Sequence, residues 1–209
     1  MNKLVKIFAS FALLGAITGQ AQAGIIFSFT ESGGNVLMNT SGVLDTSALV
    51  SHSVAGWGGT GVETNATPES DIMGDTSMGD VDTAFGFHAG TDFTPWIGDM
   101  FTFSNFNWST TGTTQFTTYI RDPNRTPGIG ISSADLIGDL WTPDVSWSKS
   151  GTFASLGLTV GDYTITDAVT SEFISIQIGQ VSSVPEPASL ALLGLGLAGL
   201  GFSRRKQSI

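Results

Sequence analysis

Short stretches in which apolar side chains occupy every second position recur along the chain. They include residues 25–30, 101–104, 116–120 and 174–178, which are rich in Ile, Phe and Thr. A period of two over four to eight such residues predicts half-buried β-strands. Glycine-containing segments, which favour turns, separate the stretches. These predicted turns are Gly33-Gly34, Thr111-Gly112, Gly128-Ile129-Gly130 and Gly161-Asp162.

A helical period is nearly absent between residues 24 and 183. Only Ser133–Leu140 predicts one short helix, with Ser132 or Ser133 as its N-cap. Many short strands with frequent turns indicate an all-β fold. We therefore expect residues 24–183 to form a single β-sandwich domain of jelly-roll-like topology.

The N-terminal segment has the pattern of a secretory signal peptide. Two lysines precede an apolar run at residues 7–17, and Ala21-Gln22-Ala23 follows it. Small residues at Ala21 and Ala23 suit recognition by signal peptidase, so we expect residues 1–23 to be removed after Ala23. A membrane anchor or a buried helix is the alternative, but an apolar run of about eleven residues is short for a hydrocarbon core of about 30 Å.

The C-terminal segment, residues 184–209, has three parts. Val184, Pro185, Glu186 and Pro187 come first, an uncharged Gly- and Leu-rich stretch follows at Ala188–Phe202, and a basic cluster comes last. The stretch is about 22 Å long as a helix, and flanking residues would help it to span a membrane. Positive charges beyond a spanning helix favour the cytoplasmic side. The basic cluster consists of Arg204, Arg205 and Lys206.

This order of motif, apolar segment and basic end resembles the PEP-CTERM sorting signal of Gram-negative bacteria. The resemblance implies that exosortase, a membrane-embedded enzyme, processes the tail near the motif, and that the C-terminal helix holds the chain at the inner membrane until then. The segment Gly151–Gly179 also resembles the closing hairpin that is frequent in exosortase substrates. The resemblance implies an address for the protein and leaves the role of residues 24–183 open.

The charge balance of residues 24–183 narrows the possible partners. This segment carries 17 carboxylates and 3 cations, a formal net charge of 3 − 17 = −14. Such a surface repels phosphate backbones, so we expect no nucleic-acid partner. The chain has no cysteine, which excludes disulfides, thiolate nucleophiles and zinc–thiolate sites.

The densest acidic stretch is the one candidate for a metal site. Oxygen ligands from flexible Asp- and Gly-rich loops suit Ca²⁺. The spacing fits no EF-hand, and a solvated acidic loop is the alternative, so we expect no resident cofactor beyond a calcium ion if that loop binds one. The candidate ligands are Asp71, Asp75, Asp80 and Asp82.

No catalytic motif stands out in the chain. There is no G-x-S-x-G, P-loop or H-E-x-x-H pattern, and His52 and His88 are the only histidines. A Ser-His-Asp arrangement is compatible with the residue order, but nothing selects a serine. We therefore expect no enzyme, and the two histidines to be ordinary loop or sheet residues.

Five tryptophans offer two interpretations. They either fill the core or lie beneath loops, or they form an exposed surface on which sugar rings stack. We expect an exported protein of the cell surface or extracellular biofilm matrix, with a structural or adhesive role. A carbohydrate-binding module for exopolysaccharide is the first alternative and a secreted glycan hydrolase the second. The tryptophans are Trp57, Trp96, Trp108, Trp141 and Trp147.

Overall fold

Two β-sheets make up the regular structure of the residues that can be described. The computed structural model describes residues 23–53, 57–64, 70–76, 80–121 and 126–179. Within them, short 3₁₀ turns are the only helical elements, at η1 (Thr94–Trp96), η2 (Ser133–Asp135) and η3 (Ala154–Leu156). The chain is all-β there, as the alternating pattern predicts.

The first sheet has the order β11-β12-β2-β1-β15-β14, and β13 pairs with both β2 and β8. Its centre is β1, which is antiparallel to β2 and parallel to β15. The strands are β1 (Gly24–Ser32), β2 (Asn35–Asp45), β8 (Ser109–Gly112), β11 (Leu136–Ile137), β12 (Leu140–Trp141), β13 (Val145–Ser150), β14 (Gly161–Thr166) and β15 (Phe173–Ile178).

The second sheet has the order β3-β6-β10-β9-β5-β4-β7. All of its pairings are antiparallel, and the β5–β9 register shifts between Asp71 and Met73. The strands are β3 (Val50–His52), β4 (Gly59–Val62), β5 (Ser70–Thr76), β6 (Thr83–Gly86), β7 (Asn105–Phe106), β9 (Phe116–Arg121) and β10 (Thr126–Ile131).

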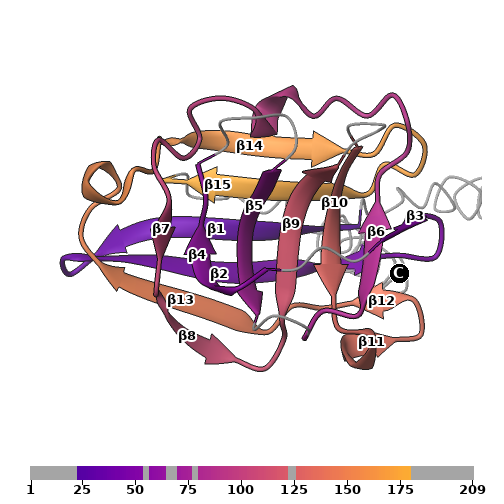
Figure 1. The fold of residues 1–209 in the computed structure, drawn as a ribbon, viewed down its shortest axis with the longest axis horizontal. Helices are drawn as coiled ribbons and strands as arrows, with labels where there is room; N and C mark the ends of the chain where they lie inside the picture. The colour runs from indigo at the N-terminus through magenta and orange to yellow at the C-terminus, as the bar shows by residue number, and fades with distance from the viewer. Residues whose placement is uncertain (1–22, 54–56, 65–69, 77–79, 122–125, 180–209) are drawn as a thin grey trace, which may run out of the picture. The chain divides into compact units, whose positions relative to one another are not determined.

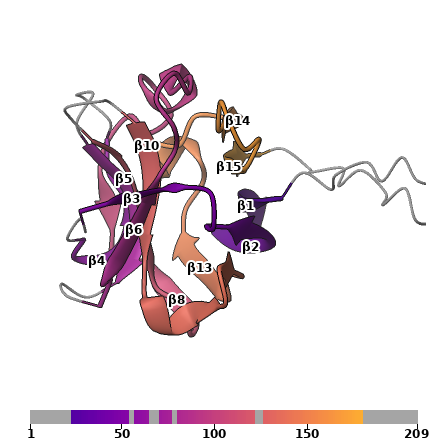
Figure 2. The same cartoon turned by 90° about the vertical axis from the view of Figure 1, so that its right-hand side faces the viewer.

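The two sheets face each other across one apolar core. Figure 1 shows the strands of the second sheet crossing in front of β1, β2 and β15, and Figure 2 shows the two layers edge-on. Phe27 of β1 stacks on Phe116 of β9 with ring centroids 4.7 Å apart, and Phe116 stacks on Trp147 of β13 at 5.7 Å. Burial of large apolar side chains from both layers is the main stabilisation of such a sandwich-like arrangement.

Three predicted strands are confirmed and one is wrong. Residues 25–30, 116–120 and 174–178 lie in β1, β9 and β15, where Ile25 and its alternate neighbours are buried. Residues 101–104 form no strand, although Phe101 makes an isolated bridge to Leu158. Phe103 is exposed, so the alternation of this segment does not reflect a face turned to the core.

Some of the predicted turns are confirmed and others are wrong. Gly33 and Gly34 make the β1–β2 turn with φ of 59° and 80°, a left-handed conformation that glycine adopts without strain. In contrast, Gly128-Ile129-Gly130 lies inside β10 and is buried. Thr111-Gly112 ends β8, and Gly161-Asp162 begins β14.

The predicted helix over Ser133–Leu140 is also wrong. Only the 3₁₀ turn η2 forms, with Ser132 as its N-cap residue, and the β11–β12 hairpin follows it. β12 pairs with the end of β2, so these residues form backbone hydrogen bonds within the sheet and not within a helix. Among the described residues no helix has the length and apolar character needed to cross a membrane. The predicted C-terminal helix lies outside these residues.

Candidate functional site

Three acidic side chains lie together at the end of the first sheet where β1 begins. We call Asp45, Asp167 and Glu172 the acidic cluster. Asp45 ends β2, while Asp167 and Glu172 lie in the connection from β14 to β15. Glu172 Oε2 accepts the backbone N–H of Asp45 at 3.1 Å, and the Asp167 N–H donates to the Glu172 carbonyl at 2.7 Å. The pairings of β1 with β2 and with β15 therefore bring three carboxylates to one edge.

Asp167 is the anchor of this connection. Its side chain is buried and accepts N–H groups from Thr170 at 2.7 Å, Val169 at 2.9 Å and His88 at 2.5 Å. His88 also places Nδ1 3.1 Å from Oδ2 of the same carboxylate. Burial raises the pKa of Asp167, but these hydrogen bonds outweigh it and lower the pKa to about 2. Asp167 is therefore ionised at neutral pH.

Glu172 is in the opposite electrostatic situation. The residue is only 8% exposed, and burial raises its pKa. The Asp45 N–H lowers the pKa again, whereas the charges of Asp45 and Asp167 raise it. The net direction is upward, because a carboxylate in such surroundings is poorly solvated and faces like charges.

The contact between His88 and Asp167 is a structural link. The Asp167 carboxylate binds both the backbone N–H and the ring of His88, which ties the segment after β6 to the β14–β15 connection. The His88 side chain is 28% exposed. Asp167 is not among the candidate residues predicted from the sequence, although Asp followed three residues later by Thr170 is a pattern typical of such side-chain-capped turns.

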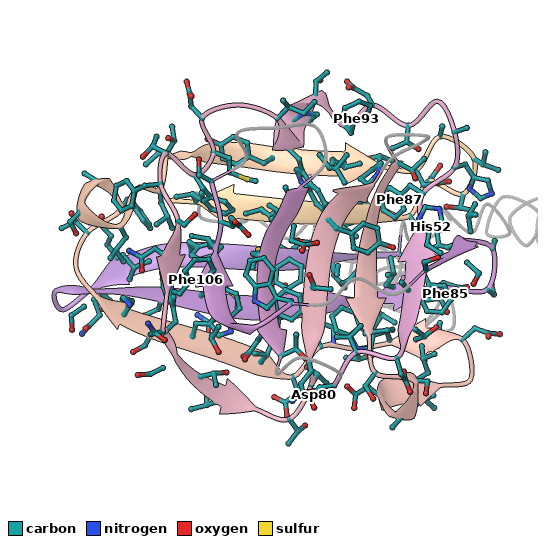
Figure 3. All side chains as sticks on the ribbon, in the orientation of Figure 1. His52, Asp80, Phe85, Phe87, Phe93 and Phe106 are labelled. Atoms are coloured by element: carbon teal, nitrogen blue, oxygen red, sulfur yellow. The ribbon has the colours of Figure 1, made fainter. Side chains whose placement is uncertain are left out.

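The four candidate calcium ligands are divided among different surroundings. Asp71 and Asp75 lie on β5, so the prediction of one acidic loop is wrong for them. The Asp82 carboxylate accepts the backbone N–H of Ser133 at 2.6 Å and the Ser133 hydroxyl at 2.7 Å, and these bonds lower the pKa of Asp82. Asp80 lies at the rim of the second sheet (Figure 3). Within the described part of the chain, no three His, Asp or Glu side chains are grouped to hold a metal ion.

Asp75 is instead a buried polar link between the two sheets. It accepts the Thr60 hydroxyl at 2.8 Å, the Trp147 indole N–H at 2.8 Å and the Thr110 hydroxyl. Thr60 belongs to the second sheet, whereas Thr110 and Trp147 belong to the first. A buried carboxylate is tolerated only when its oxygens are hydrogen-bonded, and these three donors meet that need.

The outer face of the second sheet is lined with glycines, against which aromatic rings lie. A Cβ on Gly86 would lie 2.2 Å from the His52 ring, and one on Gly74 would lie 2.6 Å from the Trp57 ring. Burial lowers the pKa of His52. Figure 3 shows His52 and Phe106 at opposite edges of this sheet. The rings fill the space that a side chain would occupy at these glycines, and they shield the backbone of the sheet from solvent.

All five tryptophans are buried and four of them lie in the core, so the structure does not favour an exposed sugar-stacking surface. Trp96 donates its indole N–H to the Tyr163 carbonyl at 2.8 Å and so covers the free edge of β14. Trp57 lies on the outer face of the second sheet but is only 4% exposed. The others are Trp108, Trp141 and Trp147, which belong to the inter-sheet core.

The predicted sorting and cleavage residues fall mainly outside the described residues. This holds for Ala21 and for all seven residues of the sorting motif, whereas Ala23 is the first residue described. A comparison with protein families finds the PEP-CTERM protein-sorting motif at residues 183–206. Neither the curated proteins nor the solved structures gave a significant match to the chain.

Proposed function

Because the chain carries a PEP-CTERM sorting motif at residues 183–206, we propose that it is an exported protein that exosortase processes at its C-terminus. Signal peptidase removes residues 1–23, and residues 24–183 then lie outside the inner membrane. The apolar segment and the basic end of residues 184–209 hold the chain there until processing. The mature product belongs to the cell surface or the extracellular matrix.

We propose a structural or adhesive role for the mature domain. Its net charge of −14 keeps an exported protein soluble and repels other polyanions. Its polar groups serve the fold, since Asp75 joins the two sheets and Asp167 anchors the β14–β15 connection. A jelly-roll-like topology remains our proposed classification of the sandwich.

The two alternatives have less support from the described residues. A carbohydrate-binding module would be favoured by tryptophans gathered on an exposed face, but all five are at most 4% exposed. A glycan hydrolase needs two carboxylates that converge on a substrate. Asp167 and Glu172 are close in sequence and space, yet the oxygens of Asp167 are occupied by its own loop and by His88.

The intact mass of the protein from the surface or medium of a host with exosortase tests the proposed route. We expect a product that begins at Gly24 and lacks the segment after the motif. A Pro185→Ala/Pro187→Ala variant is the matched control, because it changes the motif and leaves the apolar and basic parts in place. Recovery of wild-type chains that end at Ile209 would overturn the proposal. A strain without the protein that forms an unchanged matrix would contradict the structural role.

A further inference from the structure

The first strand begins directly after the bond that signal peptidase is predicted to cut. β1 starts at Gly24, which pairs with Val43 of β2 and with Phe173 of β15. Glu172 directly precedes Phe173, the residue of β15 that pairs with Gly24. The Ala23–Gly24 peptide bond therefore lies at the end of the first sheet, beside the acidic cluster.

The Glu172 side chain extends over this end of β1. β1 separates β15 from β2, and neighbouring strands are about 4.8 Å apart, so β2 and β15 are about 10 Å apart. Glu172 nevertheless reaches the backbone N–H of Asp45 on β2. Asp45 lies two residues beyond Val43, the residue of β2 that pairs with Gly24. The carboxylate therefore lies at the end of the first sheet at which β1 begins, next to the neighbours of Gly24 on both sides.

The carboxylate lacks a cationic partner among the residues described. The titratable groups that face it are Asp45 from β2 and Asp167 from its own connection, and His88 is bound to Asp167. Glu172 is more than nine-tenths buried, and its Oε2 accepts a single backbone hydrogen bond. A buried carboxylate next to like charges is stabilised most by a nearby positive charge.

We propose that the α-ammonium group formed at Gly24 by signal-peptide cleavage pairs with the Glu172 carboxylate and thereby stabilises the mature domain. Hydrolysis of the Ala23–Gly24 amide consumes one water and leaves a carboxylate on Ala23 and an ammonium on Gly24. The same nitrogen is an uncharged amide in the precursor, so the ion pair exists only after export. This inference rests on the proposed cleavage after Ala23.

The pKa of the Gly24 α-amine in the mature exported protein tests the inference. Intact mass first establishes the N-terminal residue. Competitive acetylation between pH 6 and pH 10 then reports the α-amine pKa by mass spectrometry, with Lys149 as the internal reference. An ordinary α-amine has a pKa of about 7.7–8.0, and we expect a value about one unit higher.

Two variants separate the ion pair from a general charge effect. Glu172→Gln should return the α-amine pKa to the ordinary range. Glu31→Gln, the same change at the opposite end of β1, should keep the wild-type value. If Glu172→Gln yields no folded protein, Nα-acetylation of the wild-type protein replaces it and should lower the melting temperature by several degrees.

Each contrary outcome has its own meaning. An ordinary α-amine pKa in a wild-type protein that begins at Gly24 would overturn the ion pair and leave the proposed export intact. An equally raised pKa in Glu172→Gln, or an unchanged melting temperature after Nα-acetylation, would overturn it as well. A mature N-terminus other than Gly24 would overturn both this inference and the proposed cleavage.

Discussion

The indole N–H of Trp147 donates a 2.8 Å hydrogen bond to Oδ2 of Asp75, so a side chain of the first sheet ends on a buried carboxylate of the second. Thr60 and Thr110 donate to the same carboxylate from the two sheets. The core of the sandwich therefore contains a specific polar cluster, and its hydrogen bonds between the sheets form only when the sheets face each other in this register.

We predict that Asp75→Ala is strongly destabilising. It leaves three donors without their acceptor inside the protein, so the free energy of unfolding should fall by about 3–5 kcal/mol. Urea unfolding of the mature protein measures this change. Asp144→Ala, at an exposed position, is the matched control and should stay within about 0.5 kcal/mol of wild type. Equal unfolding midpoints for the two variants would contradict the role of Asp75.

Asp167 should make the stability depend on pH in the acid range. Its pKa is about 2 in the folded protein against 3.8 ordinarily, so its contribution is present above pH 4 and is lost as the pH falls through about 2. A shift of this size corresponds to roughly 2 kcal/mol. Unfolding of wild type and Asp167→Asn at pH 7 and pH 2 checks it. A stability difference that is the same at both pH values would argue against this assignment.

Gly128 should tolerate no side chain, although it lies in a regular strand. A Cβ there would lie 2.5 Å from the Phe85 carbonyl oxygen and 2.8 Å from the Tyr119 ring. Gly128→Ala should therefore lower the melting temperature, with a cost of about 1–3 kcal/mol. Gly58→Ala, where nothing lies within 4 Å, should leave the melting temperature nearly unchanged. Two indistinguishable melting curves would show that the ring and the backbone can move aside.

The basic end of the chain should control the position of the tail before processing. Neutral residues at Arg204, Arg205 and Lys206 should weaken retention at the inner membrane, because positive charges oppose translocation. Cell fractionation of the triple variant measures the loss of the membrane-bound precursor. Unchanged fractionation and processing would count against this account of the signal.

Calcium should have no specific effect on stability. Asp75 is committed to three hydrogen bonds and Asp82 to Ser133, so the predicted ligands are not free to gather around an ion. Melting curves in millimolar Ca²⁺ and in sodium chloride of matched ionic strength should coincide, since both salts screen the negative charge. An upward shift with Ca²⁺ alone that is lost in Asp80→Asn/Asp82→Asn would contradict this prediction.

The sequence by itself determined the features that depend on local pattern. The sorting motif is read from neighbouring residues, and it needs no fold to be identified. The strands that contain Ile25, Phe116 and Ile174 follow from alternation, because successive side chains of a strand face opposite sides. The turn at Gly33-Gly34 follows from the freedom of glycine to adopt positive φ.

Only the tertiary structure decided what depends on partners distant in the chain. Gly128 and Gly130 are typical of a turn when they are considered in the sequence alone. In the structure the Tyr119 ring and the Val81 side chain pack against them, and both glycines lie in a strand. Asp75 lies in a stretch whose composition predicts a solvated loop, but Trp147, 72 residues away, supplies a hydrogen-bond donor that permits its burial. Likewise, Glu172 lies beside Gly24 only because β15 pairs with β1. Such contacts join residues far apart in the chain, so a pattern of neighbouring residues does not predict them.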